Sequence, residues 1–520
     1  MKKLKFPVFI FTLYFFLNSL NIISGQPAKH KPEKSDTTKI VEPKEVVTEG
    51  SVTVNGKEIK YKAVAGTLIL KNGNDEKTAS IFYAAYFNEA VNDKSFQPLT
   101  FLYNGGPGSS TIWLHMGAFG PKRVETNNDN LPVSPPYKGI NNEYSLLDAS
   151  DLVFIDAPGT GFSRIIGNGK DEEFYGVDND ANAFAQFITQ FLSKYERWNS
   201  PKYLFGESYG TTRSAVLANI LETNNDIRLN GVILLSAILN FDIFADYPQL
   251  NPGVDLAYIL SLPSAAATAW YHKKLPEQHL DFDSFLKDVE HFAMNDYSSA
   301  LLKGSLLGSD QKHIIAEKLH TFMGLPVPYI EKSNLRINGG QFEKELLSDS
   351  DLTTGRLDTR FSGFSMDPLS EEAEYDPVMS AITSVYVSVF NEYVRKELKF
   401  NEDIPYRTMV GLWRDWNFRH RPPGVGMAVP IATNVLPDLA AVMKYNPNLK
   451  VMLNSGYFDM ATPFYAAEYS MFHLQIPGEL QKNIEYYYYK AGHMVYIDTG
   501  SLKELHDNVA KFIRETDNLK

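Results

Sequence analysis

Apolar and polar positions alternate over 52–54 and largely over 59–64, which is the period of a half-buried β-strand. Two further strand-like runs, rich in apolar residues, follow at 67–70 and 79–86. Asn55-Gly56 separates the first two runs and is a strong signal for a two-residue hairpin turn. The pattern predicts an antiparallel start to a sheet.

Short, largely apolar runs follow, and segments with helical spacing separate them. The runs are 99–103, 152–155, 203–205, 232–235, 449–453 and 484–489. Apolar residues recur at helical spacing over 181–195, and a last amphipathic helix is expected over 501–513. Short buried strands that alternate with helices favour an α/β fold, with a mostly parallel sheet covered on both faces.

The alternation of strands and helices stops near residue 240 and resumes near residue 431. The intervening stretch is mainly helical in pattern, with Pro- and Gly-rich interruptions. We therefore expect a core formed by residues 51–239 and 431–520. Residues 240–430 are expected to form a helical cap inserted over the sheet edge at which the parallel strands end.

The first 25 residues have the pattern of an export signal. Three lysines precede an apolar stretch over 6–17, and the small residues Ser24 and Gly25 follow it. This order is typical of a signal peptide over 1–25, which predicts a periplasmic or secreted protein. An uncleaved membrane anchor is the alternative, although the polar residues at 18, 19 and 21 disfavour it. No other segment is long and apolar enough to span a membrane.

Composition narrows the possible chemistry. Residues 26–50 are rich in Lys, Glu, Pro and Thr and are expected to form a disordered leader. Cysteine is absent, which excludes disulfides, zinc–thiolate sites and a thiol nucleophile. The net charge is −12 and becomes more negative once the signal lysines are removed, so binding to nucleic acid is not expected.

A serine between two glycines is the first candidate for catalysis. Gly206-Glu207-Ser208-Tyr209-Gly210 follows the apolar run 203–205 and precedes a helix-like run over 211–222. A sharp strand-to-helix turn of this kind exposes the serine hydroxyl to substrate, so Ser208 is a candidate nucleophile. An ordinary turn with a helix-capping serine is the alternative.

A nucleophilic serine needs a histidine base and an acid that orients the base. In chain order Ser, acid, His, at the ends of later strands, the candidates are Asp459 and His493. Asp498 is a rival acid but lies too close in sequence to His493. Asp156 also ends a strand, but it precedes the serine.

A glycine-rich loop, Asn104-Gly105-Gly106-Pro107-Gly108, directly follows the run 99–103. Glycine lets backbone approach a developing oxyanion without a side chain, so we expect the Gly106 and Tyr209 N–H groups to form an oxyanion hole. A phosphate-binding loop is the alternative, but no Gly-Lys-Ser or Gly-Lys-Thr accompanies it.

These segments, together with 154–163, resemble the serine carboxypeptidase family over essentially the whole chain after the leader. Residues 325–327, 333–336 and 411–416 are similar to its bacterial branch. The resemblance implies an α/β-hydrolase fold, peptide substrates with a free C-terminus, no metal or cofactor, and an acidic preference. It also implies that Asn104, Gly105 and Glu207 bind the terminal carboxylate of the substrate.

Two departures from the family bear on these roles. Some relatives have a second Glu where this chain has Ala118, which would leave fewer carboxyl groups at the carboxylate site. Tyr457 replaces one of two acids near Asp459.

Glu207 donates a hydrogen bond only when it is protonated, and burial beside a substrate carboxylate favours that form.

We therefore expect an exported serine carboxypeptidase that uses Ser208, Asp459 and His493. An esterase or acyltransferase with the same triad is the first alternative, and a non-catalytic binding protein with this fold is the second. His272 and His279 have no accompanying ligand pattern and are expected at the surface. The sequence contains no signal for a particular oligomeric state.

Overall fold

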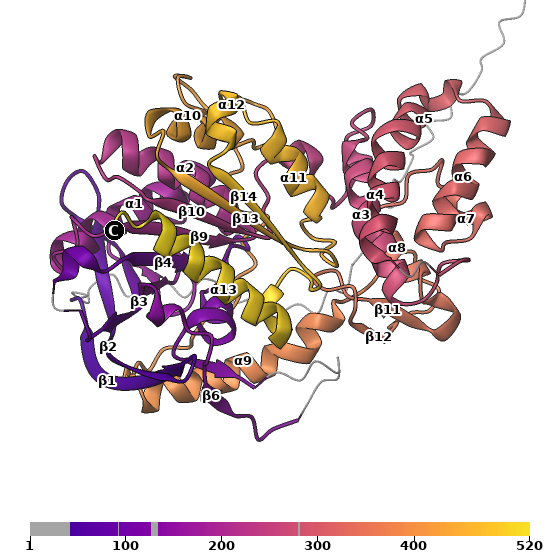
Figure 1. Cartoon of the computed structure of the whole chain (residues 1–520). Coiled ribbons are helices and arrows are strands. Elements are labelled where there is room, and N and C mark those ends of the chain that lie inside the picture. The colour runs from indigo at the N-terminus through magenta and orange to yellow at the C-terminus, as the bar shows by residue number, and fades with distance from the viewer. Residues whose placement is uncertain (1–41, 92, 126–133, 279–280, 520) are drawn as a thin grey trace, which may run out of the picture. The chain divides into compact units, whose positions relative to one another are not determined.

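The computed structural model describes residues 42–91, 93–125, 134–278 and 281–519 (Figure 1). The predicted signal peptide and most of the predicted leader lie outside these residues. Ten strands form the central sheet. Within the described part of the chain, no helix is long and apolar enough to cross a membrane.

Three long antiparallel strands begin the sheet: β1 (Glu45–Val54), β2 (Lys57–Lys71) and β3 (Lys77–Asn88). The Asn55-Gly56 hairpin is confirmed, because Val54 pairs with Lys57 and both turn residues have positive φ. The leader prediction was wrong for residues 45–50, which belong to β1. None of these residues is fully buried and only Val46 packs against the apolar core, so backbone pairing with β2 is what chiefly holds them in the sheet.

Six parallel strands continue the sheet, and all correspond to the apolar runs in the sequence. They are β4 (Leu99–Tyr103), β7 (Asp151–Ile155), β9 (Lys202–Glu207), β10 (Gly231–Leu235), β13 (Lys450–Gly456) and β14 (Ile484–Tyr489). The order across the sheet is β1-β2-β3-β7-β4-β9-β10-β13-β14, and β8 (Arg164–Ile165) pairs with β3. The predicted mostly parallel sheet with antiparallel N-terminal strands is confirmed.

Helices cover both faces of this sheet, as the full burial of β4, β7, β9 and β10 requires, whereas the edge strand β14 is only partly buried. Apolar sides of three helices pack on one face: α1 (Val177–Lys194), α2 (Tyr209–Asn224) and α10 (Leu436–Tyr445). Two helices pack on the other face: α9 (Pro377–Lys396) and α13 (Thr499–Thr516). The remaining short elements of this part are β5 (Lys122–Val124), β6 (Gly139–Asn141), α11 (Phe464–Phe472) and α12 (Gly478–Gln481).

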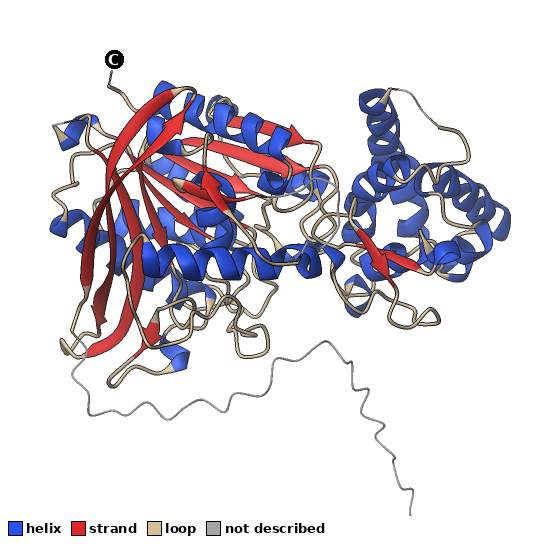
Figure 2. Cartoon of the chain, turned by 90° about the horizontal axis from the view of Figure 1, so that it is seen from below, coloured by secondary structure: helices blue, strands red, loops and turns tan. Residues whose placement is uncertain are grey.

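A group of helices with its own apolar core forms the cap, and Figure 2 shows it beside the sheet. Its elements are α3 (Leu256–Tyr271), α4 (Phe282–Phe292), α5 (Ser298–Lys303), α6 (Ser309–Met323), α7 (Val327–Lys332), α8 (Gly339–Glu345), β11 (Leu352–Thr354) and β12 (Ser362–Phe364). Phe458, Met460 and Phe464, which follow β13, contribute to the same core. The cap core therefore includes residues on both sides of Asp459.

The predicted cap over 240–430 is only partly a cap. Helix α9 returns to the sheet, because its buried side, which includes Val385 and Tyr386, packs in the core with α13. Residues 398–430 contain no helix or named strand and instead form isolated bridges with loops at the ends of the strands. One bridge joins Met409 to Ser109, beside the glycine-rich loop.

Candidate active site

Ser208 lies at the sharp turn between β9 and α2, in a backbone conformation that residues other than glycine rarely adopt. Its φ is 59° and its ψ is −130°, and its N–H donates to the carbonyl of Leu235 at 3.0 Å. A Cβ atom on Gly206 would lie 2.2 Å from the carbonyl oxygen of Gly210. Glycine at 206 therefore allows the tight turn, and the half-buried Ser208, the candidate nucleophile, lies at its tip.

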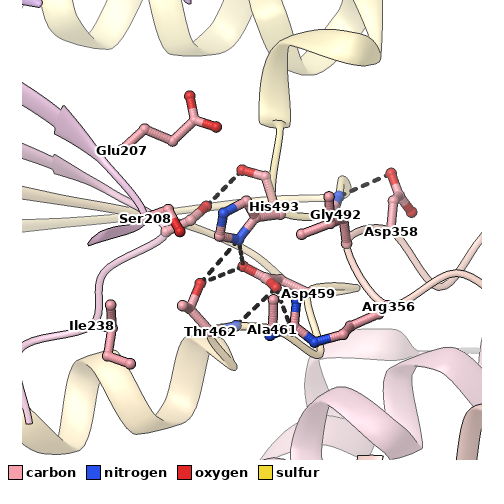
Figure 3. Close-up of polar contacts among 12 residues, drawn as sticks. Glu207, Ser208, Ile238, Arg356, Asp358, Asp459, Ala461, Thr462, Gly492 and His493 are labelled. Carbon is pink, nitrogen blue, oxygen red and sulfur yellow. Dashed lines mark hydrogen bonds and ion pairs between the residues drawn. The ribbon is translucent and has the colours of Figure 1, made fainter. Parts of the chain in front are cut away.

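Asp459 and His493 meet at the ends of β13 and β14, with 2.7 Å between Oδ2 of Asp459 and Nδ1 of His493 (Figure 3). Oδ1 of Asp459 accepts from the N–H groups of Ala461 at 2.8 Å and Thr462 at 2.9 Å. The Thr462 hydroxyl donates to Oδ2 at 2.6 Å. These bonds fix the carboxylate so that it orients the imidazole ring.

The charges of this pair are mutually stabilising. Burial by itself would raise the pKa of Asp459, but the His493 charge and the hydrogen bonds from His493 and Thr462 hold it below its usual value. Burial lowers the pKa of His493, and the Asp459 charge and hydrogen bond outweigh this effect and raise it. The acid therefore stays ionised and stabilises the protonated imidazole.

The imidazole ring lies between Ser208 and Asp459 in the view of Figure 3. The Ser236 hydroxyl, from the end of β10, donates to the His493 carbonyl at 2.6 Å and fixes this loop against the sheet. Among the described residues, Ser208 and His493 share no hydrogen bond. Catalytic contacts of this type often shorten only when substrate binds.

Neither rival acid forms a hydrogen bond or an ion pair with His493 in the described structure. Asp498 caps α13 by accepting from the Ser501 N–H at 2.8 Å. Asp156 accepts from the Thr111 N–H at 2.9 Å and from the Tyr406 hydroxyl at 3.0 Å, and so holds the segment after the glycine-rich loop. The geometry favours Asp459 as the acid.

The glycine-rich loop lies against the start of α2. Strands β4 and β9 pair with Tyr103 opposite Gly206, so the residues that follow them emerge side by side. A Cβ atom on Gly105 would lie 2.4 Å from the Tyr209 nitrogen. This contact places the loop next to the Tyr209 N–H, as an oxyanion hole built from Gly106 and Tyr209 requires.

Asn104 and Glu207 form a buried pair beside the nucleophile. The Asn104 Nδ2 atom donates to Oε2 of Glu207 at 2.8 Å, and Glu207 is 3% exposed. Burial raises the pKa of Glu207 to about 7, against the opposing effects of the His493 charge and the hydrogen bonds from Tyr496 and Asn104. Below that pH, Glu207 is largely a neutral acid that is able to donate.

The positions that depart from the family pattern have structural roles. Ala118 is buried in the π-helical turn Leu114–Phe119. Tyr457 stacks against Tyr488 in the cap core, with 5.8 Å between ring centroids. His272 is only partly buried, and its Nε2 lies 2.7 Å from the Thr359 carbonyl, so its predicted surface position holds in part. His279 lies outside the described residues, and no group of metal-ligating side chains occurs within them.

Comparison with protein-family models matches residues 55–506 to the family described as serine carboxypeptidase. The chain belongs to the serine carboxypeptidase family. This membership confirms the resemblance that the glycine-rich loop and the Ser208 turn indicated.

Two relatives of this protein align with it over very different lengths. Serine carboxypeptidase S10 family member 1 of Dictyostelium discoideum is 34% identical over 189 residues, which are 35% of this chain and 41% of that protein. Serine carboxypeptidase-like 25 of Arabidopsis thaliana is 24% identical over 414 residues, which are 77% of this chain and 74% of that protein. The match to the Dictyostelium protein thus spans less than half of its length.

A solved structure supports the fold. Kex1(delta)p, a prohormone-processing carboxypeptidase from Saccharomyces cerevisiae, aligns with a TM-score of 0.53 and 17% identity. The alignment covers 88% of this chain and 92% of that chain. This likeness confirms the α/β-hydrolase fold.

A cap segment that the sequence analysis missed holds two site loops of this family member. Residues 356–359 lie between β11 and β12. The Arg356 carbonyl accepts from the Met460 N–H at 3.1 Å, and the Leu357 carbonyl accepts from the His493 N–H at 2.6 Å. The cap is therefore bonded directly to the loops that carry Asp459 and His493. Figure 3 shows a further bond of this kind, from the Gly492 N–H to Oδ2 of Asp358 at 3.1 Å.

A buried ion pair beneath the glycine-rich loop was also missed. Arg213 on α2 and Asp180 on α1 lie 2.7 Å apart with side chains 0% and 1% exposed. Arg213 also donates to the Asn104 carbonyl at 2.8 Å, and so supports the loop from below. Asp180 precedes Phe184 by four residues on the apolar side of α1, and a charge at such a position is a signal for a buried partner.

Replacing Arg213 with methionine is expected to destabilise the protein by about 3–5 kcal/mol, because Asp180 is then buried without a partner. Urea unfolding of the purified variant measures this loss. The control is Lys503→Met, which removes the exposed Lys503–Asp507 pair on α13 and should not change stability measurably. Equal midpoints for the two variants would contradict the expectation.

Proposed function

We propose that this protein is a serine carboxypeptidase that releases C-terminal amino acids from peptides through an acyl-enzyme. The observation that best supports this proposal is the Asn104–Glu207 pair, bonded at 2.8 Å next to the Ser208 turn. Acyl transfer itself needs only the triad and the oxyanion donors. A buried amide and a neutral acid beside the nucleophile are suited to an additional task, recognition of a terminal carboxylate.

The chemical step follows from the positions of three side chains. Ser208 attacks the last peptide carbonyl while His493 accepts its proton, and Asp459 stabilises the imidazolium that forms. The N–H groups of Gly106 and Tyr209 donate to the oxyanion. His493 then donates the proton to the departing amino group, and water releases the acyl group from Ser208 by the reverse path.

Carboxylate recognition depends on which groups are able to donate. Asn104 and the Gly105 N–H donate at every pH, whereas Glu207 donates only when it is protonated. Because the pKa of Glu207 is raised to about 7, the donor form is present below that pH and is lost as the pH rises through it. We therefore propose that peptide hydrolysis is favoured at acidic pH.

The N-terminal pattern supports export. We propose that residues 1–25 are removed as a signal peptide and that the mature protein acts in the periplasm or outside the cell.

Replacing both Asn104 and Glu207 with alanine is expected to raise KM for a free-acid peptide. Each hydrogen bond to the substrate carboxylate that is removed should raise KM by about tenfold to hundredfold. The loss should be much smaller for the same peptide with a C-terminal amide, and for a simple ester. Steady-state kinetics of the wild type and the variant on these three substrates measure the effect. The amide and the ester serve as internal controls for folding and for the triad.

Glu207→Gln is the matched variant for the pH dependence. A glutamine carbonyl replaces the oxygen that accepts from Asn104, and its NH₂ group donates at every pH. Hydrolysis of the free-acid peptide by this variant should therefore decline less than that of the wild type as the pH rises past 7. If the wild type cleaves acid and amide equally well, the esterase or acyltransferase alternative is favoured instead.

A further inference from the structure

Tyr496 makes a second hydrogen bond to the carboxyl group of Glu207. It lies in the helical turn Val495–Ile497, three residues after His493, and is 1% exposed. Its hydroxyl donates to Oε2 of Glu207 at 2.8 Å. The Asn104 amide donates to the same oxygen, also at 2.8 Å.

Two donors on one carboxyl oxygen determine where a proton binds. Oε2 uses its lone pairs to accept from Asn104 and Tyr496, and a proton there would compete with both bonds. Oε1 accepts no hydrogen bond from the described residues. When Glu207 is protonated, its proton therefore belongs on Oε1, the oxygen that is free to donate.

We propose that Tyr496 is a positioning residue that confines the acidic proton of Glu207 to Oε1 and thereby directs it at the terminal carboxylate of the substrate. This inference rests on the proposed carboxypeptidase function, and it assigns to Tyr496 a role in substrate discrimination rather than in acyl transfer.

The environment of Tyr496 keeps it a donor throughout the working pH range. Burial and the Glu207 charge raise the pKa of Tyr496 well above its usual value. The other charged or titratable groups around Glu207 are Asp459 and His493 from the strand ends, together with Tyr386 from α9. A phenol of this kind does not ionise near neutral pH, so of the two hydrogen-bonded groups Tyr496 and Glu207 only Glu207 titrates there.

Glycine at position 117 makes room for this arrangement. A Cβ atom there would lie 2.4 Å from the Tyr386 hydroxyl and 2.6 Å from the Tyr496 ring. Tyr386 is fully buried, and its hydroxyl has no hydrogen-bond partner within the described structure. Tyr386 is thus a neighbouring tyrosine without the bond to Glu207, and it provides a matched control.

Tyr496→Phe tests the proposal. Loss of one neutral donor should raise KM for a free-acid peptide at pH 5 by about threefold to tenfold, with kcat little changed. Since the Tyr496 hydrogen bond lowers the pKa of Glu207, the decline of kcat/KM at high pH should also move to higher pH. Hydrolysis of the peptide amide and of an ester by Tyr496→Phe should be unaffected. Hydrolysis of all three substrates by the control variant Tyr386→Phe should also be unaffected.

A second variant, Tyr496→fluorotyrosine, preserves packing. Its more acidic hydroxyl is a stronger donor, so the decline of kcat/KM should move to lower pH, opposite to the Phe variant. If the side chain at position 496 merely fills space, neither substitution will shift the pH at which kcat/KM declines.

The outcomes separate this inference from the proposed function. A wild type that does not distinguish acid from amide removes the basis for carboxypeptidase activity itself. A wild type that does distinguish them, with an unchanged KM and pH profile in Tyr496→Phe, overturns the role of Tyr496 and leaves the carboxypeptidase proposal standing. If Tyr496→Phe loses ester hydrolysis through misfolding, the fluorotyrosine shift decides the matter, and its absence overturns the role.

Discussion

Ser208→Ala is expected to lower kcat by about 10⁵-fold or more, because the acyl-enzyme no longer forms and water must attack the bound peptide instead. Labelling by a fluorophosphonate probe should disappear at the same time. Turnover of a chromogenic peptide and gel-based probe labelling measure the two effects. Alanine retains the Cβ atom of the turn, so the thermal unfolding transition should remain close to that of the wild type.

Ser193→Ala is a suitable control for this change. Ser193 lies in the last turn of α1, exposed to solvent, where its hydroxyl donates to the Thr189 carbonyl. Its replacement should leave both labelling and turnover unchanged. Covalent labelling that persists in Ser208→Ala, at any other serine, would show that the nucleophile has been assigned incorrectly.

Most of the sheet could be predicted because its signals are local. A buried parallel strand is largely apolar, so β4 and β10 could be predicted from five residues each. The pattern failed for the first half of β1, where backbone pairing with β2 holds largely polar residues in place. It also failed to separate α9 from the cap, since an apolar helix face does not indicate which core it joins.

The candidate triad could be proposed for the same reason. Ser208, Asp459 and His493 each follow an apolar run, and parallel strands present their ends at one edge of a sheet. The residues that hold them have no such signal. Leu357 supports His493 through a backbone carbonyl, and any residue type could supply that bond. In the sequence, Tyr496 resembles a core aromatic residue between two apolar neighbours. Only the structure shows that its hydroxyl donates to Glu207.

The two titrating groups of the site favour opposite pH ranges. His493 must be neutral to accept the Ser208 proton, and its raised pKa means that this form increases only as the pH rises. Glu207 must be protonated to donate, and this form is lost as the pH rises through about 7. In the proposed mechanism, only a substrate with a free carboxylate requires both conditions. An ester or amide should therefore show the rise without the fall.

Asp459→Asn is expected to lower kcat by about 10⁴-fold while the protein remains folded. Two backbone N–H groups, of Ala461 and Thr462, donate to Oδ1, so an asparagine must place its carbonyl oxygen there. Its NH₂ group then replaces Oδ2 and donates toward Nδ1 of His493. Nδ1 becomes an acceptor, the imidazole proton moves to Nε2, and Nε2 is no longer able to accept the proton of Ser208.

Asp498→Asn provides the matched control, because it makes the same substitution in the rival acid. Asp498 caps α13 by accepting from the Ser501 N–H, and asparagine caps helices about as well. The kcat and the thermal stability of Asp498→Asn should therefore match those of the wild type. Steady-state kinetics of the two variants, with circular dichroism to verify folding, decide between the acids. A silent Asp459→Asn beside an inactive Asp498→Asn would mean that Asp498 orients His493 and that the 2.7 Å contact to Asp459 is not the catalytic one.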